Sequence, residues 1–324
     1  MDRAPDLVPH CDDHVVDAAR LHELGLTSHD IERLCRDGRL HRLVRGWFAT
    51  REPVDTVDRH LLSLRALLRH FEGRVAASHH SRLLAVGIPV WRADLSVVHL
   101  TRVRDRGSRS RQGYRVHPAL RGPRVRETTS GPVLPIAVAV VQTGILNGPM
   151  DALIAADAAL HAELVTAQGI EQALRVFAGR TGIAPVRAAL AHADGRHESP
   201  GETRLGAVLR GLEIRATPQV WIRTRQGPKR VDALLDDHPV VLEFDGAVKY
   251  RPAAGVAGAA RAAEGDGRTG LPADNPLFAE KIREDAIRDE DYEVVRVVWS
   301  QLGDPGGIRR RIESAARRAA RRAA

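Results

Sequence analysis

The sequence has few cysteines and no segment apolar enough to suggest membrane insertion. Its two cysteines, Cys11 and Cys35, cannot build a disulfide framework, and neither has a partner at a metal-ligand spacing. The first residues show no basic stretch followed by an apolar one, and no apolar run approaches the roughly 18 residues of a membrane span. We therefore expect a soluble protein of the reducing cytoplasm, with no membrane partner.

Lysine is also scarce, because only three of the 49 basic residues are lysines: Lys229, Lys249 and Lys281. Where arginine is used almost everywhere, a lysine is typical of a place that needs a compact ammonium group. Chance is the alternative for any one of them. All three lie in the C-terminal third of the chain, two of them beside an acidic motif.

Length and charge set the scale of the molecule. With 324 residues, of which 43% are hydrophobic, the chain is expected to form two or three domains. The net charge of +8 favours a polyanionic partner such as DNA. An arginine-rich composition inherited from a GC-rich genome is the alternative.

Residues 15–50 predict two helices followed by a short β-hairpin. Thr27 and Ser28 form a helix N-cap signal, the spacing of Ile31 and Leu34 is helical, and Asp37-Gly38 ends the helix. The turn Arg45-Gly46 then joins two short strands. This order is typical of winged helix-turn-helix modules, whose cations face DNA phosphates. That set is predicted to be Arg33, Arg36, Arg39, Arg42 and Arg45.

These first 50 residues, with a Thr/Ser-started helix, a Gly-Arg-Leu turn and an Arg-Gly-aromatic strand, resemble the small winged-helix domain of AbiEi-type antitoxins. The resemblance implies DNA binding within a type IV toxin–antitoxin system. The partner would be a toxin or a second copy, which the sequence does not identify. An ordinary helical hairpin used for protein contacts is the alternative.

Residues 56–197 predict a mixed α/β connecting domain, with amphipathic or Ala-rich helices and strands near 95–100 and 114–117. It resembles the connecting part of AbiEi-like proteins of actinobacterial type. The histidines have no carboxylate or cysteine at ligand spacing, so we interpret them as core or surface residues rather than metal ligands. They are His79, His80, His99 and His117.

From residue 198 the pattern predicts the order helix, strand, strand, strand, helix, strand, helix, which gives a mixed sheet flanked by helices. Asp232, near the start of one strand, is expected beside Glu243, near the end of the next. Asp245, two residues further, should face the same side. Clustered carboxylates of this kind favour a hard divalent metal such as Mg²⁺ or Mn²⁺, with Lys249 supplying positive charge to a scissile phosphate.

These motifs resemble the PD-(D/E)xK superfamily, and within it the very-short-patch-repair endonucleases. The resemblance covers about 110 residues. It implies a restriction-endonuclease-like fold in which Asp232, Glu243 and Asp245 bind the metal and act with Lys249 in catalysis. The supporting residues would be Glu202, Gln219, Lys281 and Asp285. Two departures concern activity: Asp245 stands where the superfamily has its lysine, and residues 247–250 stand where repair-type members have histidines. Glu202 resembles the helical acid of the superfamily, and helix capping is the alternative explanation for it.

The sequence thus predicts an α+β or α/β multi-domain protein. Its parts are a winged helix-turn-helix at 1–55, the connecting domain at 56–197 and a restriction-endonuclease-like domain at 198–324, with a flexible insertion at 251–276. Two functions stay open at this stage. One is a metal-dependent endodeoxyribonuclease that hydrolyses DNA phosphodiesters, and the other is a non-catalytic DNA-binding regulator or antitoxin with a degenerate nuclease fold.

Overall fold

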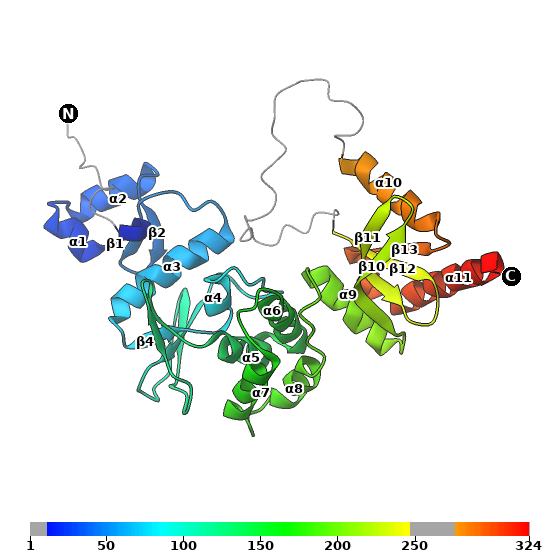
Figure 1. Cartoon of the computed structure of the whole chain (residues 1–324). Coiled ribbons are helices and arrows are strands. Elements are labelled where there is room, and N and C mark those ends of the chain that lie inside the picture. Colours follow the sequence, from blue (N-terminus) through cyan, green and yellow to red (C-terminus); the bar gives the residue numbers. More distant parts are fainter. Residues whose placement is uncertain (1–11, 247–275, 324) are drawn as a thin grey trace. The chain divides into compact units, whose positions relative to one another are not determined.

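A computed structural model describes residues 12–246 and 276–323 (Figure 1). Residue contacts divide the chain into two compact units, with the boundary between Ala193 and Asp194. Unit 1 is taken here as residues 12–193, and unit 2 as residues 194–246 and 276–323. Each unit combines helices with β-sheet, so the predicted mixed α/β, multi-domain class is confirmed at that level. Within the described ranges, no helix is long and apolar enough to cross a membrane.

Unit 1 begins with a small helical pair and a three-stranded sheet of order β1-β3-β2. The elements are a short 3-10 helix (Asp12–His14), β1 (Val15–Asp17), α1 (Ala18–Glu23), α2 (Ser28–Arg36), β2 (His41–Val44) and β3 (Trp47–Ala49). α2 starts where the sequence predicts, because the Thr27 hydroxyl accepts a hydrogen bond from the Asp30 N–H while the Asp30 carboxylate accepts one from the Thr27 N–H. Gly46, with φ 76°, makes the hairpin turn.

A six-stranded sheet of order β6-β7-β5-β4-β9-β8 forms the centre of unit 1. Its strands are β4 (Val75–Ala77), β5 (Val98–Arg102), β6 (Arg109–Arg111), β7 (Tyr114–His117), β8 (Arg126–Thr128) and β9 (Gly131–Val133). The long helix α3 (Thr56–Phe71) packs its apolar side on one face, against Val98, Leu100 and Val116. Because side chains alternate along a strand, His99 and His117 point to the opposite face.

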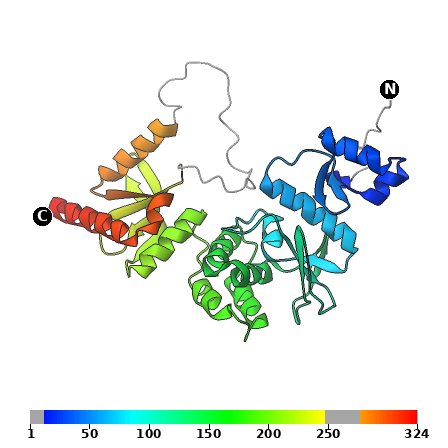
Figure 2. The same cartoon turned by 180° about the vertical axis from the view of Figure 1, so that it is seen from behind.

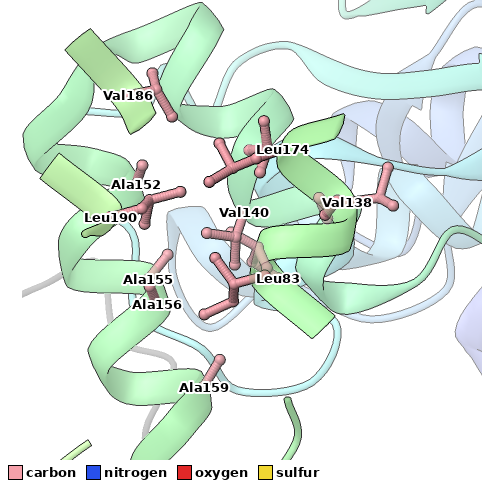
Figure 3. Close-up of a cluster of buried hydrophobic side chains, with 14 of the residues drawn as sticks. Leu83, Val138, Val140, Ala152, Ala155, Ala156, Ala159, Leu174, Val186 and Leu190 are labelled. Atoms are coloured by element: carbon pink, nitrogen blue, oxygen red, sulfur yellow. The ribbon is translucent and has the colours of Figure 1, made fainter. Parts of the chain in front are cut away.

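Five helices gather in the rest of unit 1: α4 (His79–Leu84), α5 (Ile136–Asn147), α6 (Pro149–His161), α7 (Ala167–Val176) and α8 (Ile183–Leu190). Figure 3 shows their shared core, in which Ala152, Ala155, Ala156 and Ala159 line one side of α6. These small side chains allow α6 to approach its neighbours closely. Leu83, Val140 and Leu174 fill the space between the helices.

Three helices of unit 1 come into close contact at Gly144 of α5. A Cβ atom added there would lie 2.6 Å from the Cβ of Ala152 and 3.0 Å from both Cγ atoms of Val186. Gly144→Ala is therefore expected to lower the free energy of unfolding by about 1–3 kcal/mol, because α5, α6 and α8 would have to separate. Denaturant unfolding measures the change. Gly169→Ala is the matched control, since a Cβ there meets only an ordinary contact, 3.4 Å from the Thr166 hydroxyl, so no comparable loss should appear.

Unit 2 contains the predicted order of elements: α9 (Pro200–Gly211), β10 (Ala216–Thr224), β11 (Gly227–Leu235), β12 (Val240–Asp245), α10 (Pro276–Arg288), β13 (Glu293–Val298), a 3-10 turn (Trp299–Gly303) and α11 (Pro305–Ala323). The sheet order is β10-β11-β12-β13, in which the first two pairs are antiparallel and β12 runs parallel to β13. The predicted insertion lies outside the described residues, except that Pro276 already begins α10.

The two faces of this sheet are covered by different helices, as Figures 1 and 2 show from opposite sides. Leu205 of α9 and Ile308 of α11 pack with Leu242 of β12 on one face. Ile287 of α10 packs with Val241 on the other. The helix pair α9 and α11 thus covers one face and α10 covers the other. Polar side chains lie at the end of the β11–β12 pair, beyond this apolar core.

At the C-terminal end, α11 is tied to β13 by charge as well as by apolar packing. The carboxylate of Glu293 is 7% exposed. Arg318 and Arg322 of α11 lie 2.8 Å and 3.1 Å from it. Two arginines of the Arg/Ala-rich tail thus compensate a buried charge.

Candidate functional site

Asp232 joins the ends of the β11–β12 pair through its side chain. The ladder runs as far as the Ala233–Leu242 pair, and beyond it the Phe244 N–H donates to Asp232 Oδ2 at 2.7 Å. Asp232 lies past the middle of β11 rather than near its start, because β11 extends back to Gly227 by pairing with β10. The side chain therefore lies beside the last residues of β12, where the sequence places Glu243.

Gln219 disturbs the regular strand geometry opposite Asp232. The β10–β11 register pairs Pro218 with Ala233 and Val220 with Val231, and the pair between them, Gln219 and Asp232, is missing. Gln219 has φ 55°, a left-handed conformation that glycine adopts far more readily. Such strain persists where the surrounding structure enforces it and is concentrated at functional sites. In this conformation the Gln219 side-chain amide reaches Glu202 of α9.

Glu202, in the first turn of α9, accepts hydrogen bonds from three groups. Gln219 Nε2 donates to its Oε2 at 2.9 Å, the Glu198 N–H donates to the same oxygen at 3.0 Å, and the Ser199 hydroxyl donates to Oε1 at 2.8 Å. Ser199 also caps the helix by accepting from the Glu202 N–H. Capping therefore explains part of this buried acid, while Gln219 links it to the strand that carries Asp232.

The charge of Asp232 is poorly compensated. Burial raises the pKa of the Asp232 carboxyl to about 6, and the nearby Glu202 and Glu198 carboxylates add to the rise. The hydrogen bond from the Phe244 N–H and the Arg283 guanidinium oppose it. Asp232 also lines a depression that runs along α9 and is reached from solvent. A cation bound here would relieve the repulsion between these acids.

Arg283 of α10 binds the second predicted acid. Its NH2 atom donates to Glu243 Oε2 at 2.7 Å, and its NH1 atom donates to the Arg230 main-chain carbonyl at 2.7 Å. Glu243 is 7% exposed, so its carboxylate has little contact with water, while the Arg283 side chain is half-buried. Arg283 was not among the predicted site residues. An arginine near the middle of a helix gives no local signal that it reaches a strand acid 40 residues earlier.

Asp245 has a different cationic neighbour. Its carboxylate lies 4.0 Å from Arg296 of β13, which also donates to Glu284 of α10. Asp232, Glu243 and Asp245 were predicted to form one metal-binding group. The structure does not bring them together, because their carboxylate oxygens do not all lie within 4.8 Å of one another. The reason is that Arg283 engages Glu243, Arg296 lies beside Asp245, and Asp232 faces the depression along α9.

The remaining predicted residues of unit 2 contribute less. Lys281 and Asp285 are exposed on α10, while Arg283 and Glu284 of the same helix reach the sheet. Lys249 lies outside the described residues. The acid–Gln–acid network of Glu202, Gln219 and Asp232, with Glu243 and Arg283, is therefore the best-defined polar site of unit 2, and it is called here the acidic site.

The five arginines predicted to face DNA divide into two groups. Arg33 is half-buried and forms an ion pair with Asp30, while the exposed Arg42 pairs with Glu32 and lies over the Phe48 ring. Arg36, Arg39 and Arg45 are exposed, at the end of α2, in the loop that follows it and in the hairpin turn. Arg33 and Arg42 are thus engaged by acids of the same region, and the exposed Arg36, Arg39 and Arg45 are the part of the predicted set that lies open to a phosphate backbone.

In unit 1, two strands and one helix bring together three of the histidines that were predicted to be core or surface residues. His79, His99 and His117 each offer a ring nitrogen within 4.8 Å of the other two. The sequence gives no spacing signal for this group, because its members come from one helix and from two strands joined by a long connection. These three residues are called here the histidine cluster, and their spacing would allow them to hold one metal ion.

No model of a protein family matches the sequence, and a search of curated proteins finds no match.

Proposed function

We propose that unit 2 is a nuclease-type domain whose acidic site hydrolyses a DNA phosphodiester with Mg²⁺ or Mn²⁺. The observation that carries the proposal is the junction of β11 and β12, where the Asp232 carboxylate binds the main chain next to Glu243 and shares its surroundings with Glu202. The helix-strand-strand-strand-helix-strand order, with β12 parallel to β13, also resembles the core expected of a PD-(D/E)xK domain.

The donor chemistry of the acidic site suits a hard cation. Carboxylate oxygens are the preferred ligands of Mg²⁺, which usually takes one or two of them and completes its shell with water and phosphate oxygens. Three gathered acids are therefore not required, and Asp232 with Glu243 would suffice. When bound, such a cation activates water and stabilises negative charge on the phosphate. Glu202 and Gln219 would hold the site in place, and Arg283 would limit the negative charge that it accumulates.

The test is metal-dependent DNA cleavage. Purified protein is incubated with supercoiled, linear and mismatched DNA, first with Mg²⁺ or Mn²⁺ and then with a chelator. Nicking that requires the metal and stops with the chelator supports the proposal. Absence of nicking with both metals on all three substrates would contradict it.

The second candidate is a non-catalytic DNA-binding regulator of antitoxin type. The Glu243–Arg283 ion pair favours it, because it neutralises an acid that a catalytic metal would use. The acid two residues after Glu243, where a nuclease of this type has lysine, favours it too. A gel shift without any cleavage, at every metal condition, would support this candidate over the first.

Both candidates place DNA on the exposed arginines of the α2–β3 region, which we propose acts as a winged helix. Arg39→Ala and Arg45→Ala are each expected to weaken binding to unrelated DNA sequences alike and to reduce the salt slope of log K by about 1, because each removes one phosphate contact. Arg175→Ala, an exposed change on α7, is the control and should leave the slope unchanged. Unchanged slopes for Arg39→Ala and Arg45→Ala would exclude this surface.

A further inference from the structure

We propose that His79, His99 and His117 of unit 1 form a binding site for a divalent transition metal of the zinc type. The site is separate from the acidic site and does not depend on the function proposed for unit 2. One ring nitrogen from each histidine lies within 4.8 Å of the other two. Three imidazoles with an open fourth position are a common ligand set of Zn²⁺, whereas Mg²⁺ prefers oxygen.

The sheet register brings two of the ligands together. β5 and β7 are parallel and pair His99 with Arg115 and Thr101 with His117. His99 and His117 therefore project from the same face of neighbouring strands, and His99 Nδ1 lies 2.9 Å from His117 Nε2. The third ligand, His79, begins α4, and its ring stacks on that of His117 with centroids 4.1 Å apart.

The three rings are electrically suited to bind a cation. Burial lowers the pKa of His99 to about 2 and that of His117 to about 4, and it holds the pKa of His79 well below its ordinary value. Neutral imidazoles present the lone pair that a metal needs. A single proton between two ring nitrogens can form one hydrogen bond, such as that between His99 and His117. A metal ion would instead bind all three rings at once.

His79 is held in an unfavourable conformation by polar contacts. It is 6% exposed and has φ 51°. Its Nδ1 lies 2.9 Å from the Ser78 hydroxyl, and its main-chain N–H donates to Gln142 Oε1 at 3.3 Å. Gln142 Nε2 in turn donates to the Thr101 hydroxyl. Fixing the second ring nitrogen in this way orients the first, as the outer contacts of metal-binding histidines do.

The charges around the cluster favour an anion as a fourth ligand. The Arg115 and Arg180 guanidinium groups are near enough to lower the pKa of His117. With three neutral ligands the metal would keep its full positive charge, which these arginines oppose. Hydroxide or another small anion on the open position would reduce that repulsion.

The probe for this site is Co²⁺, which replaces zinc and absorbs visible light when bound in a tetrahedral site. The full chain is titrated with Co²⁺ in the presence of excess Mg²⁺, followed by displacement with Zn²⁺. The expected result is saturable, stoichiometric binding that Mg²⁺ does not prevent. His99→Ala and the half-buried His117→Gln should each weaken it by more than about 100-fold, since even an outer contact of a metal site contributes 10–100-fold.

The exposed His192→Ala is the matched control and should bind Co²⁺ as the original chain does. Circular dichroism shows whether each variant folds. The melting temperature of the original chain gives a test that needs no variant. It should rise with Zn²⁺ concentration, because a metal that binds the folded state stabilises it. Weak, non-saturable binding to the original chain, or equal binding by the folded His117→Gln variant, would overturn the proposal.

Discussion

Asp232→Asn is expected to reduce metal-dependent DNA cleavage by roughly 10²–10³-fold, the loss typical of removing one preorganised electrostatic group from an active site. The substitution keeps the shape of the side chain and an oxygen that can accept from the Phe244 N–H, so the β11–β12 junction should remain. DNA binding through the α2–β3 region should remain as well. Plasmid nicking and gel shift measure the two effects separately.

The same variant should be more stable than the original chain. The pKa of Asp232 is raised to about 6, so the folded state holds this proton more tightly than the unfolded state does. Stability is therefore lost as the pH rises from about 4 to about 6, and above that range the penalty is constant. Asparagine removes it, and the free energy of unfolding at about pH 8 should rise by about 1–3 kcal/mol.

Asp289→Asn, an exposed change of the same charge in the turn just after α10, is the control for both readouts and should alter neither. A gain of stability when a charged group is removed is typical of a functional site, where activity is often in conflict with stability. Asp232→Asn that cleaves DNA at the original rate would remove Asp232 from the mechanism. A loss of stability at about pH 8 would instead show that the ionised carboxylate stabilises the fold, which would contradict a raised pKa of Asp232.

Asp151→Asn in α6 is expected to remove a large pH dependence of stability from unit 1. Asp151 is 3% exposed, and burial raises its pKa to about 7, against weaker opposing effects of Arg92 and the Trp91 main chain. The folded state thus binds this proton more tightly than the unfolded state, and stability falls as the pH rises from about 4 to about 7.

Between about pH 5 and pH 8 this one group should remove about 2–3 kcal/mol from the free energy of unfolding of the original chain. Urea unfolding at several pH values measures the difference, which should vanish in Asp151→Asn. The exposed Glu127→Gln on β8 is the control and should keep the original profile. Identical pH profiles for Asp151→Asn and the original chain would show that Asp151 stays ionised throughout this range.

Features fixed by local chemistry could be predicted from the sequence. The Thr27 cap of α2, the glycine turn at Gly46 and the buried strand at residues 240–242 depend on neighbouring residues only, and all three are confirmed. The order of elements in unit 2 follows from periodicity in the same way. The winged-helix and nuclease assignments, which need more than local order, remain predictions.

The acidic and histidine sites depend on contacts between distant segments, which no local pattern encodes. Arg283 reaches Glu243 across 40 residues, and His99 meets His117 only because β5 and β7 are parallel neighbours. The left-handed backbone of Gln219 also had no signal, since glutamine rarely adopts it without tertiary constraint. Sequence reasoning therefore located the acids of unit 2 and missed their arginine partner and the histidine cluster.

The pairing of Glu293 with Arg318 and Arg322 bears on how the protein is handled at the bench. Shortening the chain before Arg318 would remove both counter-charges and leave a carboxylate in a nearly dry environment, which is strongly destabilising. A purification tag is therefore better appended beyond α11 than substituted for its last turns. Poor yield of a truncated version would reflect this lost neutralisation.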